Sequence, residues 1–113
     1  MCKLSPDPAG TSDAIGPVGA TATVLVTSGD APTMRIVNAF MNGAPVLPVV
    51  DGRVVLPPLP AGNNVLDLHV LPGQTGDEVV LTEDCLDGTT RPLKRRFIGG
   101  GGDPHVGYTI HAE

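Results

Sequence analysis

The sequence predicts an all-β domain of seven or eight short antiparallel strands, arranged as a sandwich or a barrel. The clearest stretch is 46–71, where runs of Val and Leu are interrupted by Asp-Gly at 51–52, by two prolines at 57–58 and by the turn residues 60–64. These interruptions are typical of strands joined by tight turns. The chain also contains 15 Gly and 12 Pro in 113 residues, which favours many turns and few long elements.

The length of the chain allows one domain with a single hydrophobic core. Residues 1–19 are rich in Pro, Gly, Ser, Thr and Asp and show no periodicity. We therefore expect a flexible N-terminal arm that becomes ordered only when something binds it. The composition changes at residue 20, and 20–113 form the predicted β-sandwich domain.

Apolar and polar residues alternate through the first half of this domain. Residues 20–27 predict one strand and residues 33–41 a second, and Asn42-Gly43 predicts the turn that follows. Residues 46–50 and 53–56 flank the Asp-Gly pair and predict a two-residue hairpin. Prolines around this hairpin predict that it lies at the edge of a sheet, since proline has no amide hydrogen to donate.

Four further strands are expected at 64–71, 78–86, 90–98 and 105–111. The apolar face of each predicted strand should point into the core. This phase predicts a core made mainly of Val24, Val26, Ile36, Phe40, Leu66, Leu68, Val70, Val106, Tyr108 and Ile110.

Two cysteines, Cys2 and Cys85, are too few for a disulfide framework. The favoured interpretation is two free thiols in a reducing compartment, and a disulfide between them is the alternative. A third interpretation is that Cys2 is the acylated residue of a lipoprotein, although the sequence shows no leader before it.

No motif in the chain predicts a cofactor, a metal or a catalytic centre. Gly99 to Gly102 precede Asp103-Pro104 instead of the Lys and Ser or Thr of a phosphate-binding loop, so a hairpin loop is expected. His105 and His111 would lie about 20 Å apart on one strand, which leaves only His69 with one of them as a metal-binding pair. We expect surface histidines and no enzyme activity, with a small hydrolase as a remote alternative.

The formal net charge is −5, which opposes binding to nucleic acid or to an anionic membrane. No apolar run approaches the roughly 20 residues of a membrane span. The charges are nevertheless clustered, because an acidic run at 77–87 is followed by basic residues at 91–96. The favoured interpretation pairs the two runs across neighbouring strands, with Glu83 opposite Lys94. The alternative is a basic patch of Lys94, Arg95 and Arg96 that docks on an acidic protein surface.

The turn-rich run from Asp51 to Gly62, DGRVVLPPLPAG, and the spacing of the strands resemble small immunoglobulin-like or transthyretin-like sandwiches. The Cys, Trp, Cys core of immunoglobulin domains is absent, and the fold alone implies no function. In length, acidity, scarcity of aromatic residues and its N-terminal arm, the chain is similar to bacteriophage head-decoration and cement proteins. That resemblance implies a protein that docks on a capsid.

The sequence therefore suggests a non-catalytic structural module that docks on a larger protein assembly, most concretely as virion decoration. Its expected location is the virion or the host cytoplasm, and a homo-oligomer is left open. The alternative is a surface or periplasmic binding module, lipid-anchored to the cell envelope through Cys2. The residues expected to contact a partner are Leu4, Ile15, Val18, Lys94, Arg95 and Arg96.

Overall fold

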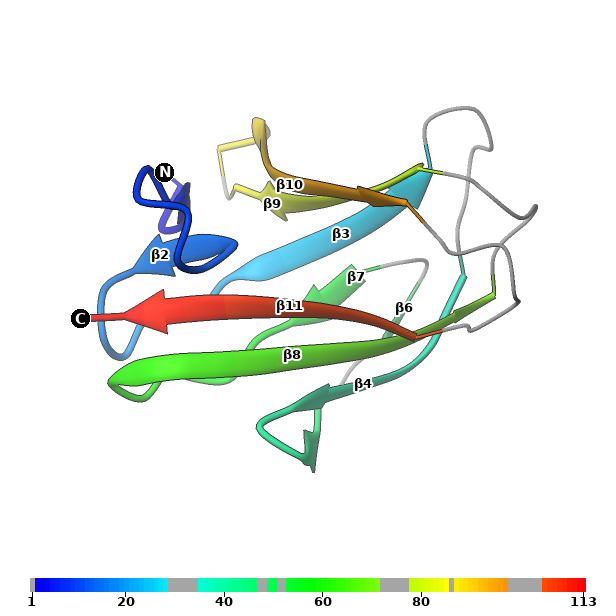
Figure 1. Ribbon diagram of the computed structural model, residues 1–113. Coiled ribbons are helices and arrows are strands. Elements are labelled where there is room, and N and C mark those ends of the chain that lie inside the picture. Colours follow the sequence, from blue (N-terminus) through cyan, green and yellow to red (C-terminus); the bar gives the residue numbers. More distant parts are fainter. Residues whose placement is uncertain are drawn as a thin grey trace.

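The computed structural model describes residues 2–28, 35–46, 49–50, 53–71, 78–85, 87–97 and 105–113, and these form two facing β-sheets without a helix (Figure 1). This architecture confirms the predicted all-β class and is that of a small β-sandwich. Each of the eight expected strands has a counterpart, and three short strands were not expected. The strands are β1 (Ser5–Pro6), β2 (Ala14–Gly16), β3 (Thr23–Ser28), β4 (Arg35–Met41), β5 (Ala44–Pro45), β6 (Val49–Val50), β7 (Arg53–Val55), β8 (Gly62–Leu71), β9 (Glu78–Asp84), β10 (Thr90–Phe97) and β11 (His105–Ala112).

The first sheet has the strand order β1-β2-β11-β8-β4-β5. The long strands β8 and β11 form its centre and pair antiparallel from His69 opposite His105 to Gly62 opposite Ala112. Strand β2 runs parallel to β11, whereas the other pairs of this sheet are antiparallel. Asn42 and Gly43 have φ values of 53° and 84°, as a type I′ turn between β4 and β5 requires.

The second sheet has the strand order β10-β9-β3-β7-β6, with all neighbours antiparallel. Val50 pairs with Arg53 and Val49 with Val54, which confirms the hairpin across 51–52 and its position at a sheet edge. The two turn residues themselves lie outside the described part of the chain. Strand β10 is the last strand at the opposite edge.

The core lies between the sheets and combines apolar side chains from both. Six predicted core residues are confirmed, and each is at most 6% exposed: Val24, Leu66, Leu68, Val106, Tyr108 and Ile110. The side chains of Val26, Ile36 and Val70 lie outside the described set. Leu56, Leu59 and Leu81 add volume to this core.

The predicted phase of β4 is wrong in its second half. Phe40 is only half-buried, whereas its neighbours Ala39 and Met41 are buried at 3% and 4% exposure. The pairing with β8 shifts between Ile36 and Asn38, and this bulge reverses which alternate residues face the core. A bulge of this kind depends on the partner strand, so alternation along β4 alone did not predict it.

The N-terminal residues are part of the fold, which corrects the expectation of an arm separate from the domain. Strand β2 pairs with β11, and β1 pairs with β2. Leu4 and Ala14 are both 0% exposed within the same core as β8 and β11. The segment 2–19 is poor in apolar residues, but two of them, Leu4 and Ala14, lie in the core of the sandwich.

Candidate functional site

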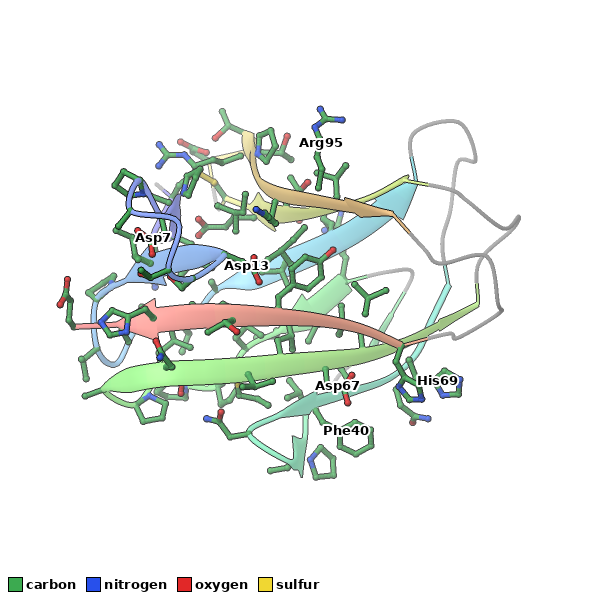
Figure 2. The ribbon with its side chains drawn as sticks, in the orientation of Figure 1. Asp7, Asp13, Phe40, Asp67, His69 and Arg95 are labelled. Atoms are coloured by element: carbon green, nitrogen blue, oxygen red, sulfur yellow. A yellow bond between two sulfur atoms is a disulfide. The ribbon has the colours of Figure 1, made fainter. Side chains whose placement is uncertain are left out.

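Strand β10 carries the predicted basic residues at the edge of the second sheet. Its pairing with β9 shifts between Pro92 and Lys94, where the strand bulges. Leu93 at the bulge is 6% exposed and anchors the strand, whereas Lys94 and Arg95 are exposed. Figure 2 shows Arg95 pointing away from the sandwich. The bulge thus combines a buried anchor with adjacent outward-facing cations.

Charge is strongly segregated along the chain. Four of the seven Lys and Arg residues lie on β10, which contains no Asp or Glu. The rest of the chain therefore has three basic and 12 acidic residues. We refer to Arg91, Lys94, Arg95 and Arg96 as the cationic edge. The side chain of Arg96 lies outside the described set, although its backbone pairs with Val79.

The predicted pair between Glu83 and Lys94 is wrong. Glu83 lies opposite Arg91, and Lys94 lies opposite Leu81, because the bulge displaces the register of β10. The neighbouring carboxylate, that of Asp84, accepts a hydrogen bond from Arg53 on β7 at 2.7 Å. The two described acidic side chains of β9 therefore interact with groups outside the cationic edge.

Glu83 is a buried carboxylate that holds the N-terminal backbone. Its side chain is on the inner face of β9, and the residue is 2% exposed. The backbone amides of Lys3 and Leu4 donate to its two oxygens at 2.8 Å each. A buried carboxylate is tolerated when such hydrogen bonds compensate for its lost hydration. Glu83 therefore fixes the chain directly before β1.

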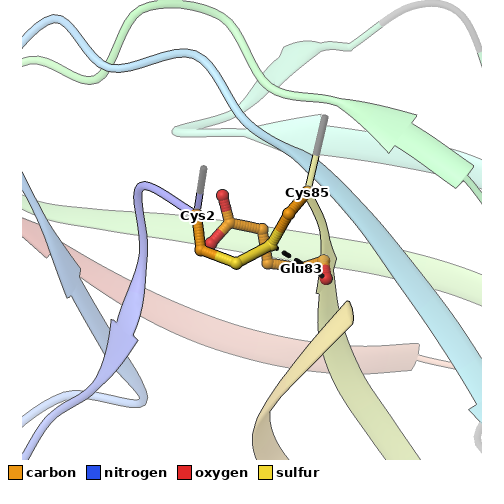
Figure 3. Close-up of side chains that lie close together, drawn as sticks. All are labelled: Cys2, Glu83 and Cys85. Atoms are coloured by element: carbon orange, nitrogen blue, oxygen red, sulfur yellow. Dashed lines mark hydrogen bonds between the residues drawn. A yellow bond between two sulfur atoms is a disulfide. The ribbon is translucent and has the colours of Figure 1, made fainter. Parts of the chain in front are cut away.

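A disulfide joins Cys2 to Cys85 beside this carboxylate (Figure 3). The two Cα atoms are 4.9 Å apart although 83 positions separate the residues in the sequence. This bond corrects the favoured interpretation of two free thiols, which rested on the absence of any local signal for proximity. It also uses the Cys2 sulfur that an acylated lipoprotein would need. We call Cys2, Leu4, Glu83 and Cys85 the N-terminal anchor.

Within the described residues, one group of three side chains has metal-ligating atoms all within 4.8 Å of one another, and it consists of Cys2, Glu83 and Cys85. A metal ion would require thiolates at this position. Both sulfurs are instead joined to each other, and the two carboxylate oxygens accept backbone hydrogen bonds. The donor set in this state does not fit a metal ion.

The predicted partner contacts in the N-terminal segment do not form one surface. Leu4 is fully buried in the core of its own domain, Ile15 is half-buried in β2, and Val18 is 52% exposed. The segment does lie against the cationic edge, since Arg91 Nη1 donates to Ser5 Oγ at 3.0 Å and to the Leu4 carbonyl at 3.4 Å. The structure thus brings together residues from opposite ends of the sequence.

Gly16 allows the N-terminal segment to pack closely on itself. A Cβ atom at this position would lie 2.7 Å from Leu4 Cδ2 and 3.2 Å from the Lys3 carbonyl oxygen. Leu4 itself is fully buried. Neither this contact nor the role of Glu83 was predicted from the sequence. The signal for Glu83 was its position between Leu81 and Cys85 on the inward-facing side of an alternating strand.

Two aspartates, Asp7 and Asp87, order short turns. The Ser12 hydroxyl and the Ala9 amide donate to Asp7 and lower its pKa from 3.8 to about 2. The hydroxyl and amide of Thr89 do the same for Asp87, whose pKa is also about 2. Each carboxylate closes an Asx-type turn, one in the N-terminal segment and one in the connection from β9 to β10.

A pocket of about 220 Å³ adjoins the N-terminal anchor. Its volume is below the roughly 300–1,000 Å³ of typical small-molecule sites. The only titratable groups around it are the Lys3 amine, the bonded Glu83 carboxylate and Asp84, which pairs with Arg53. The cationic edge is therefore the better candidate for a functional surface.

Comparison of the chain with protein-family models, with curated proteins and with solved structures finds no match. Among the described residues, no helix is long and apolar enough to cross a membrane. The geometry and charge of the cationic edge are therefore the basis for a proposed function.

Proposed function

We propose that the protein is a non-catalytic module that docks on a larger protein assembly through the cationic edge. The observation that supports this proposal is the segregation of four basic residues onto one edge strand of an otherwise acidic chain. Such a surface is complementary to an acidic protein surface. Complementary charges raise association rates and select among partners.

The position of these residues on an edge strand supports the same proposal. Edge strands present backbone N–H and C=O groups that accept a further strand. Lysine residues and bulges on edge strands discourage unselective pairing with other sheets. The exposed Lys94 and Arg95 and the bulge at Leu93 would therefore favour a partner strand or loop that brings acidic side chains.

The disulfide between Cys2 and Cys85 bears on where such an assembly would be found. Disulfides persist on secreted proteins, in the periplasm and on the surfaces of virus particles and cells, and they are rare in a reducing cytosol. We propose the outside of a virion as the most concrete location. Anchoring through an acylated Cys2 receives no support from a structure in which that sulfur is already bonded.

Cosedimentation with large particles tests this proposal. Purified protein is mixed with particle fractions from its source, and the bound amount is measured by quantitative mass spectrometry. We expect saturable binding that falls as salt rises and is abolished in the double variant Lys94→Glu/Arg95→Glu. Lys3→Glu is the control, because it reverses one charge at an exposed residue outside the cationic edge, and each of the single variants Lys94→Glu and Arg95→Glu makes the same charge change within it. Equal binding by the double variant and the control would refute docking through β10.

A further inference from the structure

Three side chains with metal-ligating atoms converge in the N-terminal anchor. Glu83 lies at the end of β9 and Cys85 directly after this strand, and the two residues are 2% and 4% exposed. The sulfurs of Cys2 and Cys85 and a carboxylate oxygen of Glu83 all lie within 4.8 Å of one another. Figure 3 shows the carboxylate beside the two sulfurs. The sulfurs are bonded to each other, so metal binding at this position requires reduction of the disulfide.

We propose that the reduced protein binds a divalent metal ion of the Zn²⁺ type, with the Cys2 and Cys85 thiolates and the Glu83 carboxylate as ligands. A dithiol reductant gives two electrons and two protons to the disulfide, which becomes two thiols while the reductant becomes a disulfide. The two thiols release their protons to solvent when they bind the ion. Thiolate ligands select zinc over magnesium and calcium, which prefer oxygen ligands.

Contacts other than the disulfide hold the chain next to Cys2. The backbone amides of Lys3 and Leu4 donate to the two oxygens of Glu83 at 2.8 Å each. The side chain of Leu4 is buried in the core. None of these contacts involves a sulfur atom. We therefore expect Cys2 to stay beside Glu83 after the disulfide is reduced.

The backbone of Cys85 is fixed in the same way by its own turn. Its amide donates to the Thr89 carbonyl at 2.9 Å, and its carbonyl accepts from the Gly88 amide at 3.1 Å. The Cα atoms of the two cysteines, which are 4.9 Å apart, should therefore remain close in the reduced protein. Zinc binds sulfur at about 2.3 Å, so two ligating sulfurs lie no more than about 4.6 Å apart. Cysteines at this Cα separation satisfy that limit.

The charge of the reduced site favours a cation. Two thiolates beside Glu83 would add negative charge to a carboxylate that is already buried, which is costly without a compensating positive charge. A divalent ion supplies that charge. Each carboxylate oxygen of Glu83 accepts one backbone amide and has a second lone pair for the ion. The two amides would then orient the ligand, as hydrogen bonds to ligating carboxylates commonly do.

The adjoining pocket gives the ion a path from solvent and room for a water ligand. Its volume is about 220 Å³, and Lys3, Glu83 and Cys85 are among the residues that line it. A water molecule takes up about 30 Å³ in the liquid. One water and three protein ligands complete the four-coordinate arrangement that zinc prefers. The N-terminal segment would thus be held by an ion in the reduced protein and by the disulfide in the oxidised protein.

Isothermal titration with ZnCl₂ tests the proposal on the full chain, first disulfide-intact and then reduced with dithiothreitol and desalted under nitrogen. We expect one ion per reduced chain and no binding to the disulfide-intact protein. Cys2→Ser and Cys85→Ser should each lower the affinity of the reduced protein by more than about 100-fold, since loss of an outer hydrogen-bond partner alone costs about 10–100-fold.

The carboxylate ligand has a matched control on the same strand. Glu83→Gln should weaken zinc binding by at least about 10-fold. Asp84→Asn makes the same chemical change at a residue that lines the same pocket, and its affinity should equal that of the parent. Equal losses in the two variants would remove Glu83 from the ligand set. Titration with Co²⁺ adds a spectroscopic readout, because thiolate-to-cobalt charge-transfer absorption appears only with sulfur ligands.

Thermal unfolding followed by circular dichroism links the ion to the anchor. Zinc should raise the melting temperature of the reduced protein and leave that of the disulfide-intact protein unchanged. If the reduced chain is unfolded without metal, zinc should restore the far-ultraviolet spectrum of the folded protein. Absence of zinc binding to the reduced chain, folded or unfolded, would overturn the site. Binding that survives Cys2→Ser or Cys85→Ser at the parent affinity would overturn it as well.

Discussion

The N-terminal anchor and the cationic edge lie next to each other, but they place charge in opposite environments. The Glu83 carboxylate is buried and accepts hydrogen bonds from two backbone amides, whereas Lys94 and Arg95 are exposed. A buried charge is costly unless it is fully bonded, so Glu83 and its partners are coupled to folding. Exposed cations contribute little to stability, and their effect is expected in binding. The N-terminal anchor is therefore expected to contribute to stability, and the cationic edge is the better candidate for a binding surface.

Deletion of residues 2–19 gives the largest expected effect on stability. The deletion removes the disulfide, the buried Leu4 side chain and the pairing of β2 with β11. Each of the first two losses typically costs about 2–5 kcal/mol, which together approach the whole stability of a small domain. Thermal unfolding followed by circular dichroism should show loss of the cooperative transition. An unchanged melting temperature would mean that the segment is the independent arm that its composition suggests.

The variant Leu4→Ala tests whether the side chain of an N-terminal residue contributes as much to stability as a side chain in the centre of the core. Leu4 and Leu68 are both 0% exposed, so each substitution by Ala should cost about 2–5 kcal/mol in unfolding free energy. Urea unfolding of the two variants gives the values. Val18→Ala is the control, because Val18 is 52% exposed and its truncation should change stability by less than about 0.5 kcal/mol. A cost near that of the control for Leu4→Ala would place the segment outside the core.

Glu83→Gln should cost about 1–3 kcal/mol, because the substitution leaves one acceptor for the two amides of Lys3 and Leu4. Asp84→Asn is a matched control on the same strand. Asp84 is partly exposed and pairs with Arg53, and such surface pairs contribute at most about 1 kcal/mol. Urea unfolding at neutral pH distinguishes the two. A larger loss in Asp84→Asn would contradict the difference between buried and exposed charge.

Lys94→Gln/Arg95→Gln should leave the unfolding free energy within about 0.5 kcal/mol of the parent, because both side chains are exposed. The same variant should bind the particles of the cosedimentation assay more weakly. Differential scanning calorimetry measures the first effect. Marked destabilisation would mean that the cationic edge is a structural feature, and the contrast between the two regions would no longer hold.

The smallest expected effect is on pH dependence. The pKa values of Asp7 and Asp87 are lowered to about 2 in the folded protein, against 3.8 as the ordinary value. A lowered folded-state pKa stabilises the fold above pH 3.8, and this contribution is lost as the pH falls to about 2. Melting temperatures between pH 6 and pH 2 should therefore fall over this interval. The fall should be shallower in Asp7→Asn, and an identical profile would show that the turn at Asp7 is not maintained.

Features encoded by neighbouring residues were predicted from the sequence. The hairpin across 51–52, the Asn42-Gly43 turn and the phase of β8 and β11 follow from turn residues and from alternation along single strands. The basic residues of β10 were identified in the same way, as a local cluster. These features need no knowledge of which strands become neighbours.

The tertiary structure alone decided the rest, because it depends on residues far apart in the chain. The disulfide spans 83 positions, and the Lys3 and Leu4 amides meet a carboxylate at residue 83. The bulges in β4 and β10 likewise depend on their partner strands. The bulge in β4 places Phe40 outside the core, and the bulge in β10 places Lys94 opposite Leu81 and not opposite Glu83. The local composition shows how few apolar residues the N-terminal segment has. It does not show that Leu4 is buried, because the core in which Leu4 packs forms only when the two sheets assemble.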